Sequence, residues 1–127
     1  MEKYQLHPRD LALIENSEVP VAVYQFIDKR VVTLALSAGF CALFGFDDRA
    51  EAYDVMDHDM YRDAHPDDVS RIADVAFRFA TEGGEYNAVY RSRASIVEAA
   101  GQWVWMMSGP KPASSATYFA ENGLPVR

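Results

Sequence analysis

Two β-rich runs that lie close together in the chain constrain its fold more than any other feature. The runs are VAVYQF at residues 21–26 and RVVTLAL at residues 30–36. The IDKR segment between them is short enough for a β-hairpin connection. Both runs place apolar residues on both faces, which indicates a sheet that is covered on each side. A β-sheet that contains this hairpin is therefore the expected centre of the fold.

Apolar residues recur at helical spacing on both sides of this hairpin. Before it, PRDLALIENS at residues 8–17 predicts a short amphipathic helix with a proline in its first turn. After it, Phe40, Leu43 and Phe44 predict a second helix, which Gly45 ends. The acidic stretch at residues 47–64 carries a broken helical stripe of Tyr53, Met56, Met60 and Tyr61.

The segment HPDD at residues 65–68 predicts the start of a longer helix. Pro66 fits the first helical position, where its missing N–H costs nothing. Asp67 and Asp68 then lie in the first turn, where the helix dipole favours negative charge. Helix physics alone accounts for most of this acidity, so we do not expect a metal or acid/base cluster here. The predicted helix has an apolar face of Val69, Ile72, Ala73, Ala76, Phe77 and Ala80, and it ends at Gly83 and Gly84.

After residue 84 the pattern returns to strands. The segments EYNAVYRSR at 85–93 and QWVWMMS at 102–108 each alternate in the way that strands do. The residues ASIVEAAG between them are expected to form a hairpin link longer than usual. SATYF at 115–119 resumes strand chemistry, and ENG at 121–123 is a turn signal. In this order the elements predict an α+β fold, in which an antiparallel sheet has its helices gathered on one face.

Composition excludes several classes of protein. A chain of 127 residues fits one domain, and 50% apolar residues are enough to bury a core. The net charge of −7 argues against a nucleic-acid partner. The single cysteine, Cys41, rules out an intrachain disulfide and favours a reducing, cytoplasmic setting. No apolar run reaches membrane-spanning length, and the N-terminus lacks the apolar core of a signal peptide.

Four segments, taken in order, resemble the PAS domain, a small sensor module of bacterial signalling proteins. They are SAGFCALFGF (37–46), HPDDVSRI (65–72), EGGEYNAVYRSR (82–93) and GQWVWMMSG (101–109). The resemblance implies a PAS-like antiparallel sheet with short helices packed on one face, preceded by an N-terminal amphipathic helix. We expect an N-terminal helical cap at 1–19 and a PAS core at 20–127. One departure is Ser37, which stands where the family often has asparagine.

The end of the chain is a second departure from the family pattern. ENGLPVR resembles the turn just before the last PAS strand, which normally lies in the middle of the sheet. Either the chain stops before that strand, or residues 113–120 form it. We expect the strand to be missing, and a longer protein to continue into a C-terminal output domain. The resemblance implies a diguanylate cyclase or a histidine kinase for that domain.

The resemblance also implies a small-molecule pocket between the helices and the sheet, although an ordinary closed core explains the same apolar stripes. Haem is disfavoured because residues 69–81 lack the histidine of the haem-binding subgroup. A covalently linked flavin is disfavoured because the motif of that subgroup is not visible around Cys41. The cofactor therefore stays unknown, and no metal is expected. The candidate pocket residues are Tyr53, Met56, Met60, Tyr61, Phe77, Val89, Trp105 and Met107.

These features favour a sensory and dimerisation module that binds a small ligand or a partner and regulates the output domain. A homodimer is expected through the outer sheet face and the N-terminal helix, because the strands carry two apolar faces and the helical layer covers only one of them. The residues of these two faces are Trp103, Trp105, Tyr86 and Tyr90 on one and Val104 and Met106 on the other. The alternative is that residues 8–17 cover the second face within one chain. A structural adaptor of the same fold would differ only in lacking a ligand.

An enzyme is the alternative function from a different class. It would be a small stand-alone hydrolase or isomerase on a similar α+β fold. Such an enzyme needs an acid/base pair that faces a pocket. The candidates for that pair are His58, Asp59, Asp63 and His65.

Overall fold

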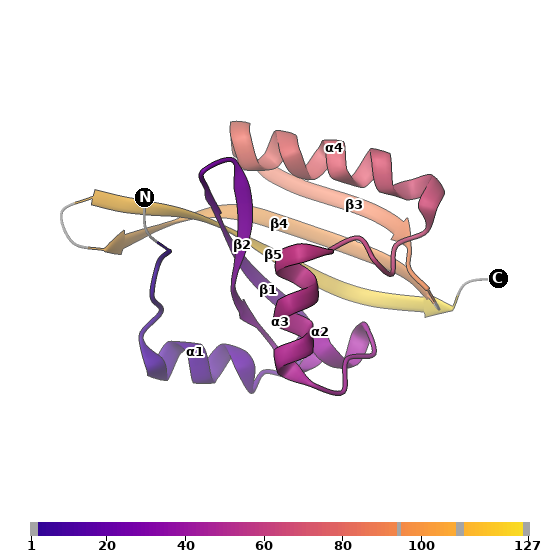
Figure 1. Cartoon of the computed structure of the whole chain (residues 1–127), viewed down its shortest axis with the longest axis horizontal. Coiled ribbons are helices and arrows are strands. Elements are labelled where there is room, and N and C mark those ends of the chain that lie inside the picture. The colour runs from indigo at the N-terminus through magenta and orange to yellow at the C-terminus, as the bar shows by residue number, and fades with distance from the viewer. Residues whose placement is uncertain (1–2, 94, 109–110, 126–127) are drawn as a thin grey trace.

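A computed structural model describes residues 3–93, 95–108 and 111–125; the side chains of residue 95 and of residues 102–125 lie outside that description. The fold is α+β, as predicted (Figure 1). The helices are α1 (Pro8–Glu15), α2 (Ala38–Leu43), α3 (Arg49–His58) and α4 (Pro66–Glu82). The strands are β1 (Val21–Ile27), β2 (Arg30–Leu36), β3 (Glu85–Arg91), β4 (Ser95–Ser108) and β5 (Lys111–Pro125).

The five strands form one antiparallel sheet in the order β2-β1-β5-β4-β3. Strand β5 therefore lies in the middle, paired with β1 on one side and β4 on the other (Figure 1). The prediction that the last strand is missing from the chain is wrong. The predicted turn at ENG is also wrong, because Asn122 and Gly123 pair with Glu98 and Val97 of β4.

The hairpin between β1 and β2 is confirmed. Asp28 and Lys29 have φ angles of 50° and 65°, so both central turn residues are left-handed. This is the geometry of a type I′ turn, whose twist matches that of the flanking strands. The turn closes the ladder at the pair Ile27 and Arg30.

The long link predicted between the third and fourth strands does not exist. Strand β4 starts at Ser95, and Ile96 and Gln102 pair with Arg91 and Glu85 of β3. The connection is therefore residues 92–94 alone. Ile96 and Val97 favour a strand, whereas residues 98–101 (EAAG) have weak strand propensity, and the pairing of the whole segment with β3 outweighs that local preference.

Helices α2, α3 and α4 cover one face of the sheet. One buried cluster joins Tyr24 and Leu36 of the sheet to Phe40 of α2 and Val55 of α3. A second cluster joins α4 to β3 and contains Ile72, Phe79, Tyr86 and Ala88. The site described below lies between these two clusters.

The opposite face of β1 and β2 is covered by the N-terminal segment of the same chain. The buried residues there are Val23, Leu34 and Ala35. The side chains packed on them come from α1 and the residues before it, and they are Tyr4, Leu6, Leu11 and Ile14. This part of the second apolar face is therefore covered within one chain. The homodimer stays a prediction.

Ser37 is the N-cap of α2. Its buried Oγ accepts from the N–H groups of Phe40 at 3.0 Å and Val21 at 2.8 Å, and it donates to the carbonyl of Val19 at 2.6 Å. Two residues later, a Cβ on Gly39 would lie 2.0 Å from the carbonyl oxygen of Glu18. Helix α2 can therefore lie against residues 17–20 only with glycine at position 39.

Within the described residues, no helix combines the length and the apolar character needed to cross a bilayer.

Candidate functional site

A cavity of about 80 Å³ lies between the sheet and helices α2, α3 and α4. Its apolar wall includes Phe40 and Phe44 around α2, Met56 of α3, Met60 of the segment between α3 and α4, and Ile72 of α4. The rings of Phe40 and Phe44 are 4.6 Å apart between centroids. Methionine and aromatic side chains adapt easily to irregular space, so this wall is suited to a small apolar group.

Three of the candidate pocket residues line the cavity: Met56, Met60 and Tyr61. Tyr53 does not line it. Its hydroxyl accepts from the N–H of Leu36 at 3.0 Å and donates to the carboxylate of Glu15 at 2.8 Å, so it joins elements on the far side of α3. The side chains of two further candidates, Trp105 and Met107, lie outside the described residues.

Phe77 and Val89 were placed wrongly in the pocket. They are 61% and 53% exposed. Helix α4 turns Ile72 and Ala76 toward the cavity, and Phe77 lies one residue further round the helix. In β3 the residues on the cavity side are Tyr86, Ala88 and Tyr90, so the alternation puts Val89 on the outer side.

Tyr86 and Tyr90 line the cavity and are the main site residues missing from the predicted pocket. Tyr86 packs in the same buried cluster as Phe79 of α4, and the two ring centroids are 5.6 Å apart. The polar residues that alternate with these tyrosines along β3 are the sequence signal that could have found them. Glu85 and Asn87 are polar, so their face of the strand is expected to point to solvent. The opposite face, which carries the tyrosines, is then expected to point into the core.

Three of the tyrosines that line the cavity have hydroxyls with different surroundings. The hydroxyl of Tyr24 lies 3.5 Å from the sulfur of Met56 and donates to it. The hydroxyls of Tyr61 and Tyr90 make no hydrogen bond to any side chain or backbone group that the structure describes. Burial raises the pKa of Tyr61, and burial together with Tyr61 raises the pKa of Tyr90 to about 12. Both phenols are therefore protonated donors at neutral pH.

Asp63 also lines the cavity, and two arginines balance its charge. Arg93 lies 2.6 Å from Oδ1, and Arg62 lies 3.1 Å from Oδ2. The guanidinium of Arg62 is also stacked 5.3 Å from the centre of the Phe46 ring. Asp63 therefore closes the edge of the cavity through its contacts with the two arginines, and its carboxylate is already paired.

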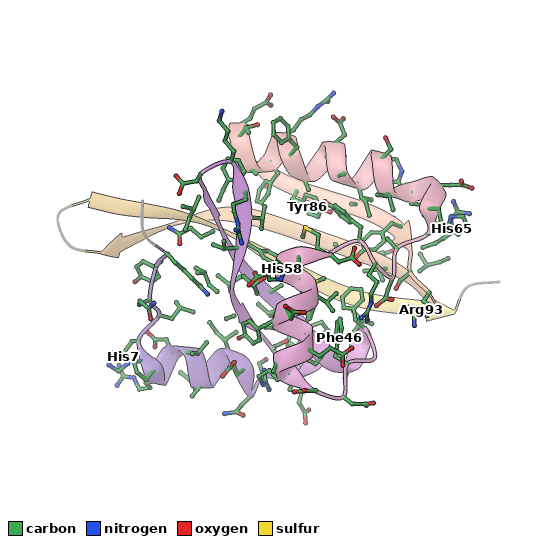
Figure 2. All side chains as sticks on the ribbon, viewed as in Figure 1. His7, Phe46, His58, His65, Tyr86 and Arg93 are labelled. Carbon is green, nitrogen blue, oxygen red and sulfur yellow. The ribbon has the colours of Figure 1, made fainter. Side chains whose placement is uncertain are left out.

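The residues proposed for acid/base catalysis do not converge on one site. His58 is exposed at the end of α3, with its Nδ1 3.1 Å from Asp54. His65 caps α4, where its Nδ1 accepts from the N–H of Asp67 at 3.1 Å. Figure 2 shows the two histidines apart, at the end of α3 and the start of α4. Asp59 is exposed, and Asp63 is held by arginines. The described residues contain no group of three or more side chains that could hold a metal ion.

Asp68 is the one acidic residue of the HPDD segment that cap chemistry does not explain. It is 7% exposed and forms a two-pronged ion pair with Arg91, at 2.8 Å and 3.0 Å. It also accepts from the N–H of Arg91 at 2.8 Å. These contacts hold the pKa of Asp68 well below its usual range. The first turn of α4 is thereby fixed to the end of β3.

Helix α3 is fixed to the other edge of the sheet by side chains one turn apart. Arg49 donates to the carbonyl of Leu36 at 2.7 Å, and Tyr53 accepts from the N–H of the same residue. One turn further on, Asp57 accepts from the N–H of Thr33 at 2.8 Å. Arg49 also donates to the carbonyl of Glu15 at 2.9 Å. Helix α3 thus joins the cavity wall, the edge of β2 and the end of α1.

Cys41 belongs to α2 and lies in the buried cluster, and burial raises the pKa of its thiol. A reactive thiolate is therefore disfavoured at neutral pH.

The sequence matches no protein-family model and no curated protein. Among solved structures, one similar chain is a domain assigned to a light and redox sensing histidine kinase of Haloarcula marismortui. It has 16% identity and a TM-score of 0.59 over 91% of this chain and 97% of that chain. Another is the PAS domain of a protein from Colwellia psychrerythraea, with 11% identity and a TM-score of 0.53 over 88% of this chain and 93% of that chain. This chain has a PAS-like fold. The PAS-like arrangement of sheet and helices predicted above is confirmed.

Proposed function

We propose that this PAS-like chain senses a small ligand in its internal cavity and regulates an output domain of a bacterial signalling protein. The observation that carries the proposal is the cavity itself, which α2, α3 and α4 enclose against the sheet. In the proposed longer protein the output domain is C-terminal and resembles a diguanylate cyclase or a kinase. The buried, unpaired Cys41 supports a cytoplasmic setting.

Helix α3 supplies the proposed route from the cavity to the rest of the molecule. Met56 on one side of α3 lines the cavity, whereas Arg49 and Tyr53 contact Glu15 and the edge of β2. A ligand that displaces Met56 therefore also strains the contacts that hold α1. The ligand shifts the equilibrium only by the difference between its affinities for the two arrangements. In this proposal the change then reaches the output domain through α1 and the sheet.

The cavity can be tested with xenon, which occupies dry apolar cavities. In protein labelled at the methionine methyl groups, xenon should shift the NMR signals of Met56 and Met60. Ala76 lines the cavity, so Ala76→Leu should fill it and abolish the shift. Ala73→Leu on the same helix is the matched control and should leave the shift intact. If xenon moves neither methionine signal in the unchanged protein, the cavity is a closed core and the sensory proposal fails.

The route through α3 has its own measurement. Hydrogen exchange of the α1 amides should become faster when xenon occupies the cavity, because α1 is tied to α3 through Glu15. The amides of β3 are the internal reference. If xenon binds and α1 exchange does not change, the cavity exists but does not signal through the N-terminal helix.

A further inference from the structure

The polar groups of the cavity limit the chemistry of its ligand, and this inference rests on the proposed sensory function. The carboxylate of Asp63 is paired with Arg62 and Arg93, and the hydroxyl of Tyr24 contacts Met56. Tyr86 also lines the cavity and has an interaction of its own. Tyr61 and Tyr90 remain, together with Ser92 beside them, because their hydroxyls make no hydrogen bond within the part of the chain that the structure describes. They are donors without an acceptor.

These two tyrosines reach the cavity from different elements that are held together. Tyr61 precedes α4, and Tyr90 lies near the end of β3; both pack on the same buried cluster around Ile72. An antiparallel bridge between Ala64 and Ser92 ties the two segments. The N–H of His65 also donates to the carbonyl of Arg91 at 2.7 Å. The backbone therefore holds the segments of both tyrosines together in the wall of the cavity.

The charge of the lining excludes ionic ligands. No arginine, lysine or histidine is among the residues described as lining the cavity, so an anion would be buried without a counter-charge. A cation would have to displace Arg62 or Arg93 from Asp63. A neutral molecule with a hydrogen-bond acceptor meets neither obstacle and satisfies the free hydroxyls.

Volume limits the size of that molecule. The cavity is about 80 Å³, roughly half of the apolar cavity of about 150 Å³ that holds benzene. It therefore accommodates about three or four non-hydrogen atoms without movement of the helices. We infer that the cavity takes a small neutral ligand with one hydrogen-bond acceptor, such as a carbonyl oxygen, which accepts from the hydroxyls of Tyr61 and Tyr90.

Three probes of the same planar shape test this inference: acetone, isobutene and acetate. Isobutene replaces the carbonyl oxygen of acetone by a methylene group, and acetate adds a charge. Binding to the full chain is followed by the methyl NMR signals of Met56 and Met60. The double variant Tyr61→Phe with Tyr90→Phe removes both donors, and Tyr4→Phe is the matched control because Tyr4 lies on the opposite face of the sheet.

Acetone should bind the unchanged protein and the Tyr4→Phe control equally, and about tenfold more weakly to the double variant. Isobutene should bind the double variant at least as well as the unchanged protein, which also shows that the variant is folded. The inference is overturned if acetone binding survives in the double variant, or if acetate binds as well as acetone. If isobutene binds while acetone does not, the ligand class is wrong and the cavity still senses apolar molecules. If no probe binds, the inference and the sensory function fail together.

Discussion

At the scale of single residues, the buried polar groups separate well-satisfied positions from one exception. Ser37 makes three hydrogen bonds, and Gln25 accepts from the N–H of Tyr4 at 2.6 Å. Asp68 is held by Arg91. The exception is Thr33, which is fully buried and whose Oγ1 has no hydrogen-bond partner among the described residues. Such a group costs free energy that an apolar side chain of the same shape avoids.

Thr33→Val should therefore stabilise the fold. Valine keeps the shape and the strand preference of threonine and removes the unpaired hydroxyl, so we expect about 1 kcal/mol in the free energy of unfolding. Urea denaturation measures this change. Thr81→Val is the control, since the Thr81 hydroxyl donates to the carbonyl of Phe77 at 2.9 Å and its loss should not stabilise. A destabilised Thr33→Val would mean that a water molecule satisfies the hydroxyl.

The ion pair of Asp68 should give a pH-dependent stability. The pKa of Asp68 is lowered in the folded chain from an ordinary value of 3.8. The contribution of Asp68 to the free energy of unfolding is therefore fully present above pH 3.8. As the pH falls below 3.8, the unfolded chain takes up the proton first, and the contribution declines toward the much lower folded pKa. Asp68→Asn should therefore be destabilising at pH 7, and the difference from the unchanged protein should shrink steadily below pH 3.8.

Denaturation by urea at a series of pH values checks this expectation. Asp74→Asn is the matched control, because Asp74 lies on the same helix in an exposed pair with Arg78 at 3.4 Å. It should change stability little at any pH. A difference for Asp68→Asn that stays constant between pH 7 and pH 2 would show that the carboxylate does not need its charge.

At the scale of elements, two helices protect the two edges of the sheet with side chains. Helix α3 uses Arg49, Tyr53 and Asp57 along the edge of β2. Helix α4 uses Asp68 and Arg71 along the edge of β3, where Arg71 donates to the carbonyl of Val89 at 2.7 Å. Unpaired edge groups invite association with other chains, so these contacts also limit aggregation.

Arg49→Met should loosen α1 more than any other helix. Arg49 joins the carbonyls of Glu15 and Leu36, so its loss frees the end of α1 while the apolar packing of α1 remains. We expect amide exchange in α1 to rise about tenfold, with exchange in α4 unchanged. The control is Arg78→Met, which removes an exposed arginine from α4. Equal exchange rates in the two variants would remove α3 from the proposed route.

Gly39→Ala should destabilise the fold strongly, because backbone atoms, and not a flexible side chain, occupy the space that the new Cβ would need. The added Cβ would lie 2.0 Å from the carbonyl oxygen of Glu18, so α2 must move away from residues 17–20. We expect a loss of about 3 kcal/mol by thermal or urea unfolding. Gly45→Ala provides the comparison: it has open space and a φ of +74°, so only backbone strain of about 1 kcal/mol opposes it. Equal losses would show that α2 shifts without penalty.

The elements that local chemistry determines were predictable from the sequence, and those that depend on pairing were not. Pro66 and the acidic first turn identified α4, and the short IDKR link identified the first hairpin. Residues 95–101 form strand through the adjacent strand β3, and residues 121–123 form strand through residues 97 and 98, so neither segment shows its state in its own sequence pattern. The same limit applies to the site. Met56 and Tyr61 followed from a helical stripe, whereas the inward face of β3 depends on where α4 packs.

At the scale of the whole molecule, the sheet is covered on both sides by one chain but not completely. Helices α2, α3 and α4 take one face, and the N-terminal segment covers β1 and β2 on the other. Two large apolar side chains of the N-terminal region stay at the surface: Leu13 and Val19 are 68% and 56% exposed. An exposed leucine on the helix that covers the outer sheet face is the place where a second copy can bury apolar surface.

If the predicted homodimer forms through α1, Leu13→Glu should convert it to a monomer. A new carboxylate at a two-fold interface meets its own copy, and each chain already carries a net charge of −7, so repulsion adds to the lost apolar contact. Phe77→Glu is the matched control: Phe77 is 61% exposed on α4, on the other side of the sheet, and its replacement should leave the dimer intact. Sedimentation velocity on the three proteins measures the association, which added salt should strengthen by screening the net charge. An unchanged protein that sediments as a monomer, or a dimer that only Phe77→Glu dissociates, would remove α1 from the interface.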